Sequence, residues 1–377
     1  MAIAIEWFLL ALPLVFLLGW FSARLDIRDI RKSGRELPHA YLKGLSHLLR
    51  DQKKRALDAF LRAQPLDPQS AELQFAIGDL SRRRGEYRRA LEVHQQLCER
   101  EDLSAADRKR ALWELAGDYF QMGFLDVAEK HAAMIKDDDY RERVGGMLLE
   151  IRQRACDYSG ALDVLDNMSK EASLMRRTTR AHLLCECASR KTVVDEKRQL
   201  LEAALVAYSN CARAGIMLGD MSVAEQNYES AVARYTAVEG QNSRYLWCAV
   251  EGAMAAYESQ QKITAGIDEM LRWLQHYPSS LLFEAVYQAM AARGMEANLA
   301  GDNLKHGLGL AAAAAWSGEK EQQAVGDERD LWRALTQAVT LKRRYRCENC
   351  GYETGNFAWQ CHNCLSWESF QSGEMHG

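Results

Sequence analysis

The chain has 377 residues, of which 48% are hydrophobic, and this is ample for a large buried core. Five prolines in that length favour a mostly helical protein. The formal net charge of -4 argues against a general nucleic-acid-binding protein, because phosphate contacts need a strongly basic surface.

An apolar segment opens the chain. Glu6 is the only charged residue in 2–23, and a helix of that length, at about 1.5 Å per residue, spans roughly the 30 Å of a bilayer core. No Lys or Arg precedes the segment and no convincing small-residue cleavage site follows it, which disfavours a cleaved signal peptide, the main alternative. We therefore expect a transmembrane anchor over residues 1–23.

The following segment, residues 24–38, is rich in arginine. Positively charged flanks stay in the cytoplasm, so this segment predicts an N-terminus outside the cytoplasm and everything after Arg24 inside it. Six cysteines scattered through helical sequence, interpreted as small buried thiols, favour a reducing compartment and agree with that topology. We interpret residues 24–38 as a basic cytoplasmic linker.

A repeat can be read in residues 41–97. Gly78 follows Gly44 after 34 residues, and Ala90 follows Ala56 after the same interval. This is the period of the tetratricopeptide helix hairpin, in which small residues let two helices approach closely. Because one hairpin cannot bury its apolar face alone, the repeat predicts an all-α solenoid of stacked hairpins.

Weaker copies of the repeat extend the predicted array over residues 39–300. Residues 181–212 have the length and apolar spacing of one unit, but Lys197 stands where a small residue is expected, so we interpret them as a degenerate fifth unit. An irregular helical protein with chance matches is the alternative. Residues that mark the third, fourth, sixth and seventh units are Ala116, Ala128, Ala161, Gly219, Ala231 and Gly266.

Three side chains on the first helix of the second unit are predicted to project toward the concave groove of the solenoid. They are Asp79, Arg82 and Arg83. A solvated helix face is the alternative interpretation of such charges. We treat these residues as candidates for partner binding.

The repeat fades beyond Pro278. Residues 281–298 retain helical spacing of apolar side chains, whereas 301–326 are rich in glycine and alanine. An apolar stripe in 328–342 predicts a helix that caps the last hairpin. We therefore expect an irregular segment and a capping helix over residues 301–342.

The last segment, residues 343–377, contains two Cys-x-x-Cys pairs, Cys347 with Cys350 and Cys361 with Cys364. Each pair forms a tight turn able to direct two sulfurs at one point. Four converging thiolates make a closed structural site for zinc or for a single iron. So small a segment would not bury enough surface to fold without its metal, so we predict a metal-binding module.

Two alternatives concern the chemistry of this site. His362 lies between two cysteines and could replace one of them as a ligand. Iron in the same cage could carry an electron, which would make the protein a rubredoxin-like electron carrier. The chain shows no flavin, nicotinamide or haem motif and no phosphate-binding, metalloprotease or nucleophile-elbow motif. We therefore predict no enzyme activity and no catalytic residues.

The order of anchor, array and four-cysteine tail resembles the lipopolysaccharide assembly protein B family of Gram-negative bacteria, and the resemblance covers essentially the whole chain. The motif residues that carry it are Tyr41, Gly44, Tyr345, Arg346, Cys347, Cys350, Gly351, Trp359, Cys361, Cys364 and Trp367. It implies a rubredoxin-like zinc-ribbon module that packs against the array and is needed for function. This sequence departs from the family's pattern in residues 301–326 and at Lys197.

The resemblance also implies a function. The family suggests an inner-membrane adaptor that brings LpxC, the committed-step deacetylase of lipid A synthesis, to the membrane-bound protease FtsH and so regulates lipopolysaccharide levels. A general scaffold for envelope-biosynthesis enzymes is the rival interpretation. The sequence leaves open the oligomeric state, including a homodimer, and the choice between zinc and iron.

Overall fold

The computed structural model divides the chain into two units, Met1–Ile151 and Arg152–Gly377. The predicted anchor, the predicted linker and nearly all of the predicted segment 301–342 lie outside the part of the chain that the structure describes. Among the described residues, no helix is both long enough and apolar enough to cross a bilayer. The described residues are 39, 41–168, 173–295, 326, 329 and 345–372.

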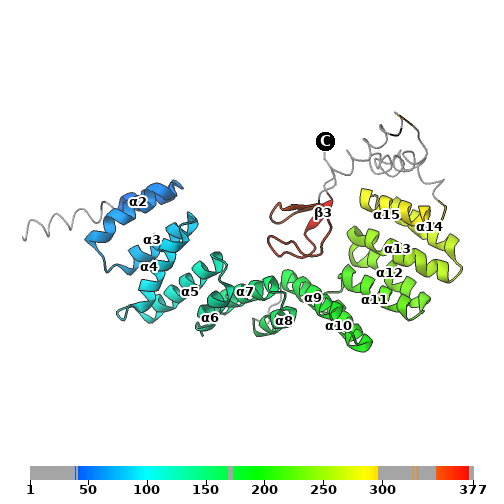
Figure 1. Cartoon of the computed structure of the whole chain (residues 1–377), viewed down its shortest axis with the longest axis horizontal. Helices are drawn as coiled ribbons and strands as arrows, with labels where there is room; N and C mark the ends of the chain where they lie inside the picture. The colour runs from blue at the N-terminus through cyan, green and yellow to red at the C-terminus, as the bar shows by residue number, and fades with distance from the viewer. Residues whose placement is uncertain are drawn as a thin grey trace, which may run out of the picture. The chain divides into compact units, whose positions relative to one another are not determined.

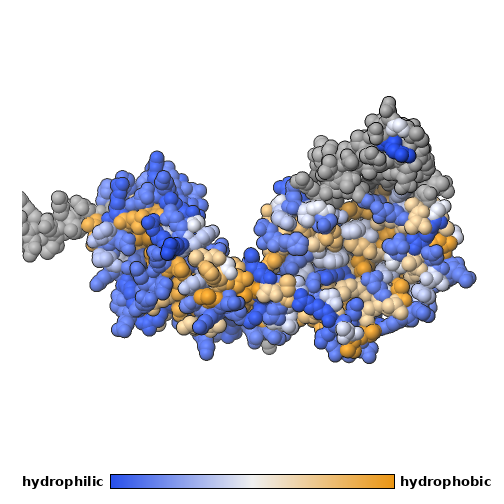
Figure 2. Space-filling view, in the orientation of Figure 1, coloured by the Kyte–Doolittle hydropathy of each residue, from blue (hydrophilic) through white to orange (hydrophobic). Residues whose placement is uncertain are grey.

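The described part of the first unit consists of consecutive helices joined by short turns (Figure 1). In the view of Figure 2, α2 to α4 present a mostly hydrophilic surface, as expected of helices that bury only one face. A helix over residues 41–49 comes first. It is followed by α2 (Lys53–Ala63), the 3₁₀ turn η1 (Gln64–Leu66), α3 (Ala71–Arg83), α4 (Tyr87–Glu99), α5 (Ala105–Gln121), α6 (Leu125–Ala133) and α7 (Asp138–Arg154), the helix in which the division between the units falls.

The second unit contains further helices and a small sheet at the C-terminal end. The predicted helix after Pro278 is present as α15, and the predicted degenerate fifth repeat is a helix pair, α9 and α10. The helices are α8 (Tyr158–Asn167), α9 (Leu174–Ser189), α10 (Val194–Ala207), α11 (Ala212–Ala224), α12 (Tyr228–Asn242), the 3₁₀ turn η2 (Ser243–Tyr245), α13 (Leu246–Ser259), α14 (Ile263–His276) and α15 (Ser280–Ala291).

Close packing within hairpins explains the small residues of the repeat. A side-chain carbon added at Gly44 would lie 2.5 Å from the ring of Phe60, and one added at Gly219 would lie 2.6 Å from the ring of Tyr235. In both hairpins the glycine on the first helix makes room for a large ring on the second. The predicted tetratricopeptide-like architecture is confirmed on this physical basis.

The turn inside six of the described hairpins repeats with the same backbone conformation. In the first unit, the residue two positions before the second helix has a positive φ: +52° at Asp51, +79° at Gly85 and +83° at Gly123. In the second unit the same place is taken by Cys156, Gln226 and Gln261, with φ of +55° to +61°.

The pair α9 and α10 has no positive-φ residue at this turn. Lys197 is half-buried at the position where other units carry a small residue. The pair still buries Cys185, Leu201 and Ala204 completely. It therefore keeps the helix-pair architecture while departing from the repeat both in its turn and in its small residues.

The first unit also contains a buried polar network between α3, α4 and α5. Asp118 is fully buried, and its carboxylate accepts hydrogen bonds from His94 at 2.5 Å and from Arg82 at 3.1 Å. Arg82 pairs in addition with Glu114 and with Asp79. These contacts join adjacent hairpins by charge as well as by apolar packing.

The C-terminal sheet has the strand order β2-β1-β3 and is antiparallel throughout. Its register pairs Tyr345 of β1 with Thr354 of β2, and Cys347 of β1 with Phe370 of β3. We call residues 345–372 the ribbon. Its strands are β1 (Tyr345–Cys347), β2 (Glu353–Thr354) and β3 (Phe370–Ser372).

Candidate metal centre

Two turns of similar construction present the four cysteines. In the first, the backbone N–H of Gly351 donates to the carbonyl of Cys347 at 2.9 Å. In the second, the N–H of Leu365 donates to the carbonyl of Cys361 at 2.9 Å. The residue that closes each turn has a left-handed backbone, with φ of +74° at Gly351 and +59° at Leu365. Each turn thereby directs both of its sulfurs toward the same point.

The sulfur positions fit a single metal ion. The Sγ atoms of Cys347 and Cys364 are 3.6 Å apart, and those of Cys350 and Cys361 are 3.7 Å apart. All four sulfurs lie within 4.8 Å of one another. Metal–sulfur bonds of about 2.3 Å in a tetrahedral site place the sulfurs about 3.8 Å apart, close to the observed spacing. A disulfide would need about 2.05 Å, and the four cysteines are free.

Hydrogen bonds around the sulfurs favour thiolates, which are the form that binds metal. Burial acts to raise the pKa of Cys347, but hydrogen bonds with Ser369 and with two backbone N–H groups bring that pKa below its ordinary value. Burial opposes a low pKa at Cys364 as well, yet hydrogen bonds with Ser366 lower that pKa to about 6. Burial raises the pKa of Cys361 to about 12. A bound metal ion would replace the proton there, because its charge would stabilise the thiolate directly.

Four sulfurs are enough to complete a tetrahedral coordination sphere. The alternative ligand, His362, is exposed to solvent and is not among the residues whose ligand atoms converge, which are the four cysteines. A site closed by four thiolates leaves no position for a water or a substrate. The arrangement therefore stabilises the fold of the ribbon and does not supply an open metal for hydrolysis.

The ribbon is anchored to the helices of the second unit by a buried amide. Gln153, at the end of α7, has only 8% of its surface exposed. Its Oε1 accepts hydrogen bonds from Gln360 Nε2 at 2.8 Å and from the indole N–H of Trp367 at 3.1 Å. One acceptor on the array thus satisfies two donors of the ribbon.

Aromatic packing adds an apolar component to the same interface. Trp359 lies against Tyr245 with ring centroids 4.8 Å apart, and Phe357 meets Trp247 edge-on at 5.0 Å. Phe357 and Trp359 pack against the hydrophobic cluster built by α11 to α15. Such aromatic pairs stabilise an interface by about 0.5–1.5 kcal/mol each beyond simple area burial. The ribbon therefore shares the core of the second unit.

His182 of α9 is the third element of the interface. It is fully buried and stacks on Trp367 with ring centroids 4.9 Å apart. Its Nε2 lies 3.0 Å from the carboxylate of Glu368, which accepts the hydrogen bond. Removing either partner would leave a buried polar group without its hydrogen bond, which is costly, so this contact fixes the orientation of the ribbon on the array.

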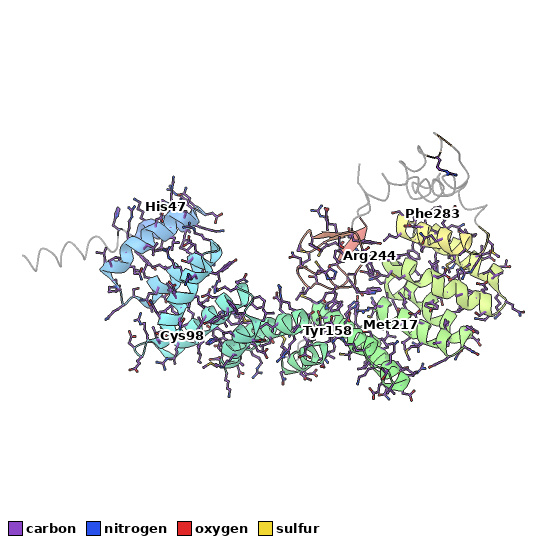
Figure 3. All side chains as sticks on the ribbon, in the orientation of Figure 1. His47, Cys98, Tyr158, Met217, Arg244 and Phe283 are labelled. Carbon is purple, nitrogen blue, oxygen red and sulfur yellow. The ribbon has the colours of Figure 1, made fainter. Side chains whose placement is uncertain are left out.

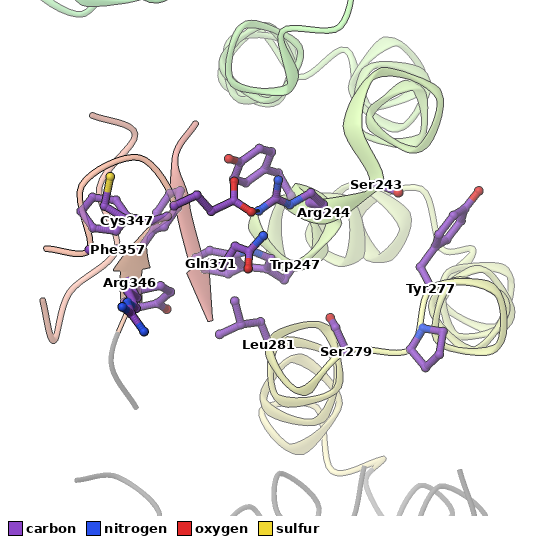
Figure 4. A pocket seen from close by; sticks show the side chains of 16 residues that line it. Ser243, Arg244, Trp247, Tyr277, Ser279, Leu281, Arg346, Cys347, Phe357 and Gln371 are labelled. Carbon is purple, nitrogen blue, oxygen red and sulfur yellow. Dashed lines mark hydrogen bonds and ion pairs between the residues drawn. The ribbon is translucent and has the colours of Figure 1, made fainter. Parts of the chain in front are cut away.

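An open groove of about 760 Å³ runs between the ribbon and the end of the array (Figure 4). Arg346 and Phe357 line its ribbon side, and Tyr277 and Leu281 line its helix side. Arg244, labelled in Figure 3, bridges to the ribbon through a salt bridge of 3.5 Å with Glu348. The groove thus combines aromatic walls with charged groups of both signs.

Residues 345–372 match a family model described as a rubredoxin metal binding domain. Lipopolysaccharide assembly protein B of Escherichia coli is 25% identical over 380 residues, covering 97% of this chain and 98% of that protein. The protein of the same name from Haemophilus influenzae is 25% identical over 402 residues, with the same coverage of both chains. The chain thus resembles lipopolysaccharide assembly protein B almost from end to end.

That resemblance confirms the one inferred from the motifs, and it includes the array as well as the ribbon. A tetratricopeptide repeat protein from Parabacteroides merdae aligns with 81% of this chain and 99% of its own, with 13% identity and a TM-score of 0.27.

The predicted partner-binding residues lie together on α3. Arg82 is only 17% exposed and is engaged by Glu114 and Asp118 inside the first unit. Asp79 pairs with both Arg82 and Arg83, and Arg83 is the most exposed of the three at 58%. These pairs give Arg82 a role within the array, and partner binding by the three residues stays a prediction.

Sequence reasoning missed the residues that hold the ribbon in place. Gln153, His182 and Tyr245 lie in helical sequence far from the cysteines, with no motif around them. The only available signal was indirect. The ribbon carries more aromatic residues than 28 residues can bury by themselves, which indicates a second surface against which Trp359 and Trp367 pack.

Proposed function

We propose that the protein is an inner-membrane adaptor that regulates lipopolysaccharide biosynthesis by promoting FtsH-dependent proteolysis of the deacetylase LpxC. The proposal includes a single N-terminal anchor, a periplasmic N-terminus and the bulk of the protein on the cytoplasmic side. The observation that carries it is the similarity to lipopolysaccharide assembly protein B over 97% of the chain.

The physical character of the molecule supports an adaptor. A solenoid of helix pairs offers an extended surface for protein partners. The four-cysteine site is closed, so its metal, zinc or iron, acts on the fold of the ribbon. Tethering such a surface at a membrane raises the effective concentration of a captured partner beside a membrane protease to roughly millimolar, so moderate affinities suffice.

The test measures LpxC half-life in cells that lack the protein and are complemented with one of three forms. The full chain restores rapid turnover. A form that begins at Arg24 binds LpxC in a pull-down but leaves the half-life long, because the tether is missing. Cys361→Ser, which breaks the metal site, also leaves it long, whereas Cys98→Ser, a cysteine outside the site, behaves as wild type.

Normal LpxC turnover with the anchor-free form would contradict the tethering step. If loss of the protein disperses a complex of envelope enzymes without changing the LpxC half-life, the general scaffold is favoured instead. Metal analysis of the purified protein separates the structural interpretation from the electron carrier, since only iron supports reversible one-electron reduction.

A further inference from the structure

A second group of metal-ligand side chains lies outside the four-cysteine site, at the interface between the ribbon and the array. It consists of His182 from α9, Cys211 at the start of α11 and Glu368 from the ribbon. One ligand atom from each lies within 4.8 Å of the other two. Three elements distant in sequence therefore bring an imidazole, a thiol and a carboxylate to one point.

The site is dry. His182 and Cys211 have no exposed surface, and the side chain of Glu368 is 10% exposed. Glu368 is bonded to His182 at 3.0 Å and lies 3.5 Å from the amide nitrogen of Asn242. The other ring nitrogen of His182, Nδ1, is buried and has no hydrogen-bond partner among the described residues. The polar capacity of this buried imidazole is therefore not satisfied by the protein alone.

The charges at this point favour a cation. Cys211 and Glu368 can present a thiolate and a carboxylate, and both lie beside the imidazole of His182 with little or no exposure to water. Isolated buried charges are costly, and a bound dication would neutralise them.

The donor set selects the kind of metal. One nitrogen, one sulfur and one carboxylate oxygen form a combination that suits zinc and disfavours calcium or magnesium, which prefer oxygen ligands alone. Zinc bonds of about 2.0–2.3 Å put the ligand atoms of a tetrahedral site about 3.5 Å apart. The three atoms here lie within 4.8 Å of one another, with His182 Nε2 and Glu368 at 3.0 Å, so binding needs only local adjustment. We propose that His182, Cys211 and Glu368 bind a second zinc ion that links the ribbon to the array.

This site is separate from the four-cysteine centre in its ligands and in its effect. The four-cysteine centre holds the ribbon's own turns together. The second ion would be held by one ribbon residue and two array residues, so it would cross-link the interface that Gln153 and Trp367 also stabilise. Cys185 donates its hydrogen bond to the ligating sulfur of Cys211, which holds that sulfur in place.

The experiment counts zinc in the full-length protein after zinc loading and gel filtration. Wild type is expected to hold two zinc ions per chain, and Cys211→Ala is expected to hold one while keeping its helical circular dichroism. Cys187→Ala is the matched control, because Cys187 lies on α9 but outside the cluster, and it should hold two. A single zinc in wild type, or two in Cys211→Ala, would overturn the proposal.

A cobalt titration of the wild-type protein gives an independent result if Cys211→Ala releases both ions. The first equivalent should produce the strong thiolate-to-cobalt absorption of four sulfurs. The second should produce a separate, weaker band, because only one sulfur contributes, and Glu368→Gln should reduce the affinity for that second equivalent at least tenfold. Saturation after one equivalent overturns the second site.

Discussion

The two units each bury a histidine against a carboxylate, but they use the pair differently. In the first unit, His94 of α4 faces Asp118 of the neighbouring hairpin at 2.5 Å. In the second unit, His182 faces Glu368, which lies 186 residues further along the chain, at 3.0 Å. Both histidines are fully buried, so water does not compete with either hydrogen bond.

The difference lies in what each pair depends on. Asp118 is part of an α-helix that forms with the array, and Arg82 provides it with a second hydrogen bond. Glu368 lies in the ribbon at a left-handed position, with φ of +52°, and we expect its segment to need a metal to fold. A similar contact is therefore independent of metal in the first unit and dependent on it in the second.

Loss of the metal should produce the largest difference in stability between the two units. Structural zinc contributes about 10–16 kcal/mol of apparent binding free energy in small zinc domains, so Cys361→Ser should unfold the ribbon. Helices α9, α12 and α13 should then lose protection in hydrogen exchange, because their ribbon-facing side chains become exposed, while α3 to α5 keep theirs. Cys98→Ser is the control. Equal loss of protection in both units would refute the distinction.

Breaking the pair in the first unit should have the next largest effect. Asp118→Ala leaves His94 and Arg82 without their shared carboxylate and should lower the free energy of unfolding by about 3–5 kcal/mol. Urea unfolding, followed by hydrogen exchange within α3 to α5, measures the change, and zinc content should stay at the wild-type value. Asp79→Ala, which removes a partly exposed partner of Arg82, should cost at most about 1 kcal/mol. Similar losses of unfolding free energy for the two variants would show that burial of the carboxylate does not determine the size of the loss.

Local patterns explain which parts of this molecule the sequence could predict. Gly44 and Gly78 recur because each makes room for a ring on the partner helix, and this requirement repeats with the period of the hairpin. The four cysteines stand out because each pair forms a turn of its own. Both signals involve residues close together in the chain.

The interface between the ribbon and the array has no such local signal in the sequence. Trp367 bonds to Gln153 across 214 residues, and nothing in the sequence around Gln153 marks it as an acceptor. The left-handed turns at Cys156 and Gln226 were equally hidden, because neither residue is the glycine that this backbone favours. In both cases the folded structure imposes a conformation or contact that the local sequence does not predict.

Removing the acceptor that two ribbon side chains share should destabilise the ribbon less than removing the metal does. Gln153→Ala leaves the buried donors of Gln360 and Trp367 without this acceptor, at a cost of about 1–3 kcal/mol. Faster hydrogen exchange in residues 345–372 and faster loss of zinc to a chelator should report it, with the first unit unchanged. Gln288→Ala, an exposed glutamine on α15, is the matched control and should change neither rate. An unchanged ribbon in Gln153→Ala would assign the interface to aromatic packing alone.

The smallest effect concerns the hairpin turns, where the units differ in residue type. A side chain added at Gly85 would meet nothing within 4 Å, so Gly85→Ala in the first unit tests the backbone alone and should destabilise by about 1 kcal/mol. Gln226→Gly in the second unit relieves the same conformation and should stabilise by up to about 1 kcal/mol. Thr192→Gly, at the corresponding position of the α9–α10 turn, which lacks a positive φ, should instead destabilise slightly. Thermal unfolding of the three variants compares them, and destabilisation by Gln226→Gly would show that chain entropy, not handedness, controls these turns.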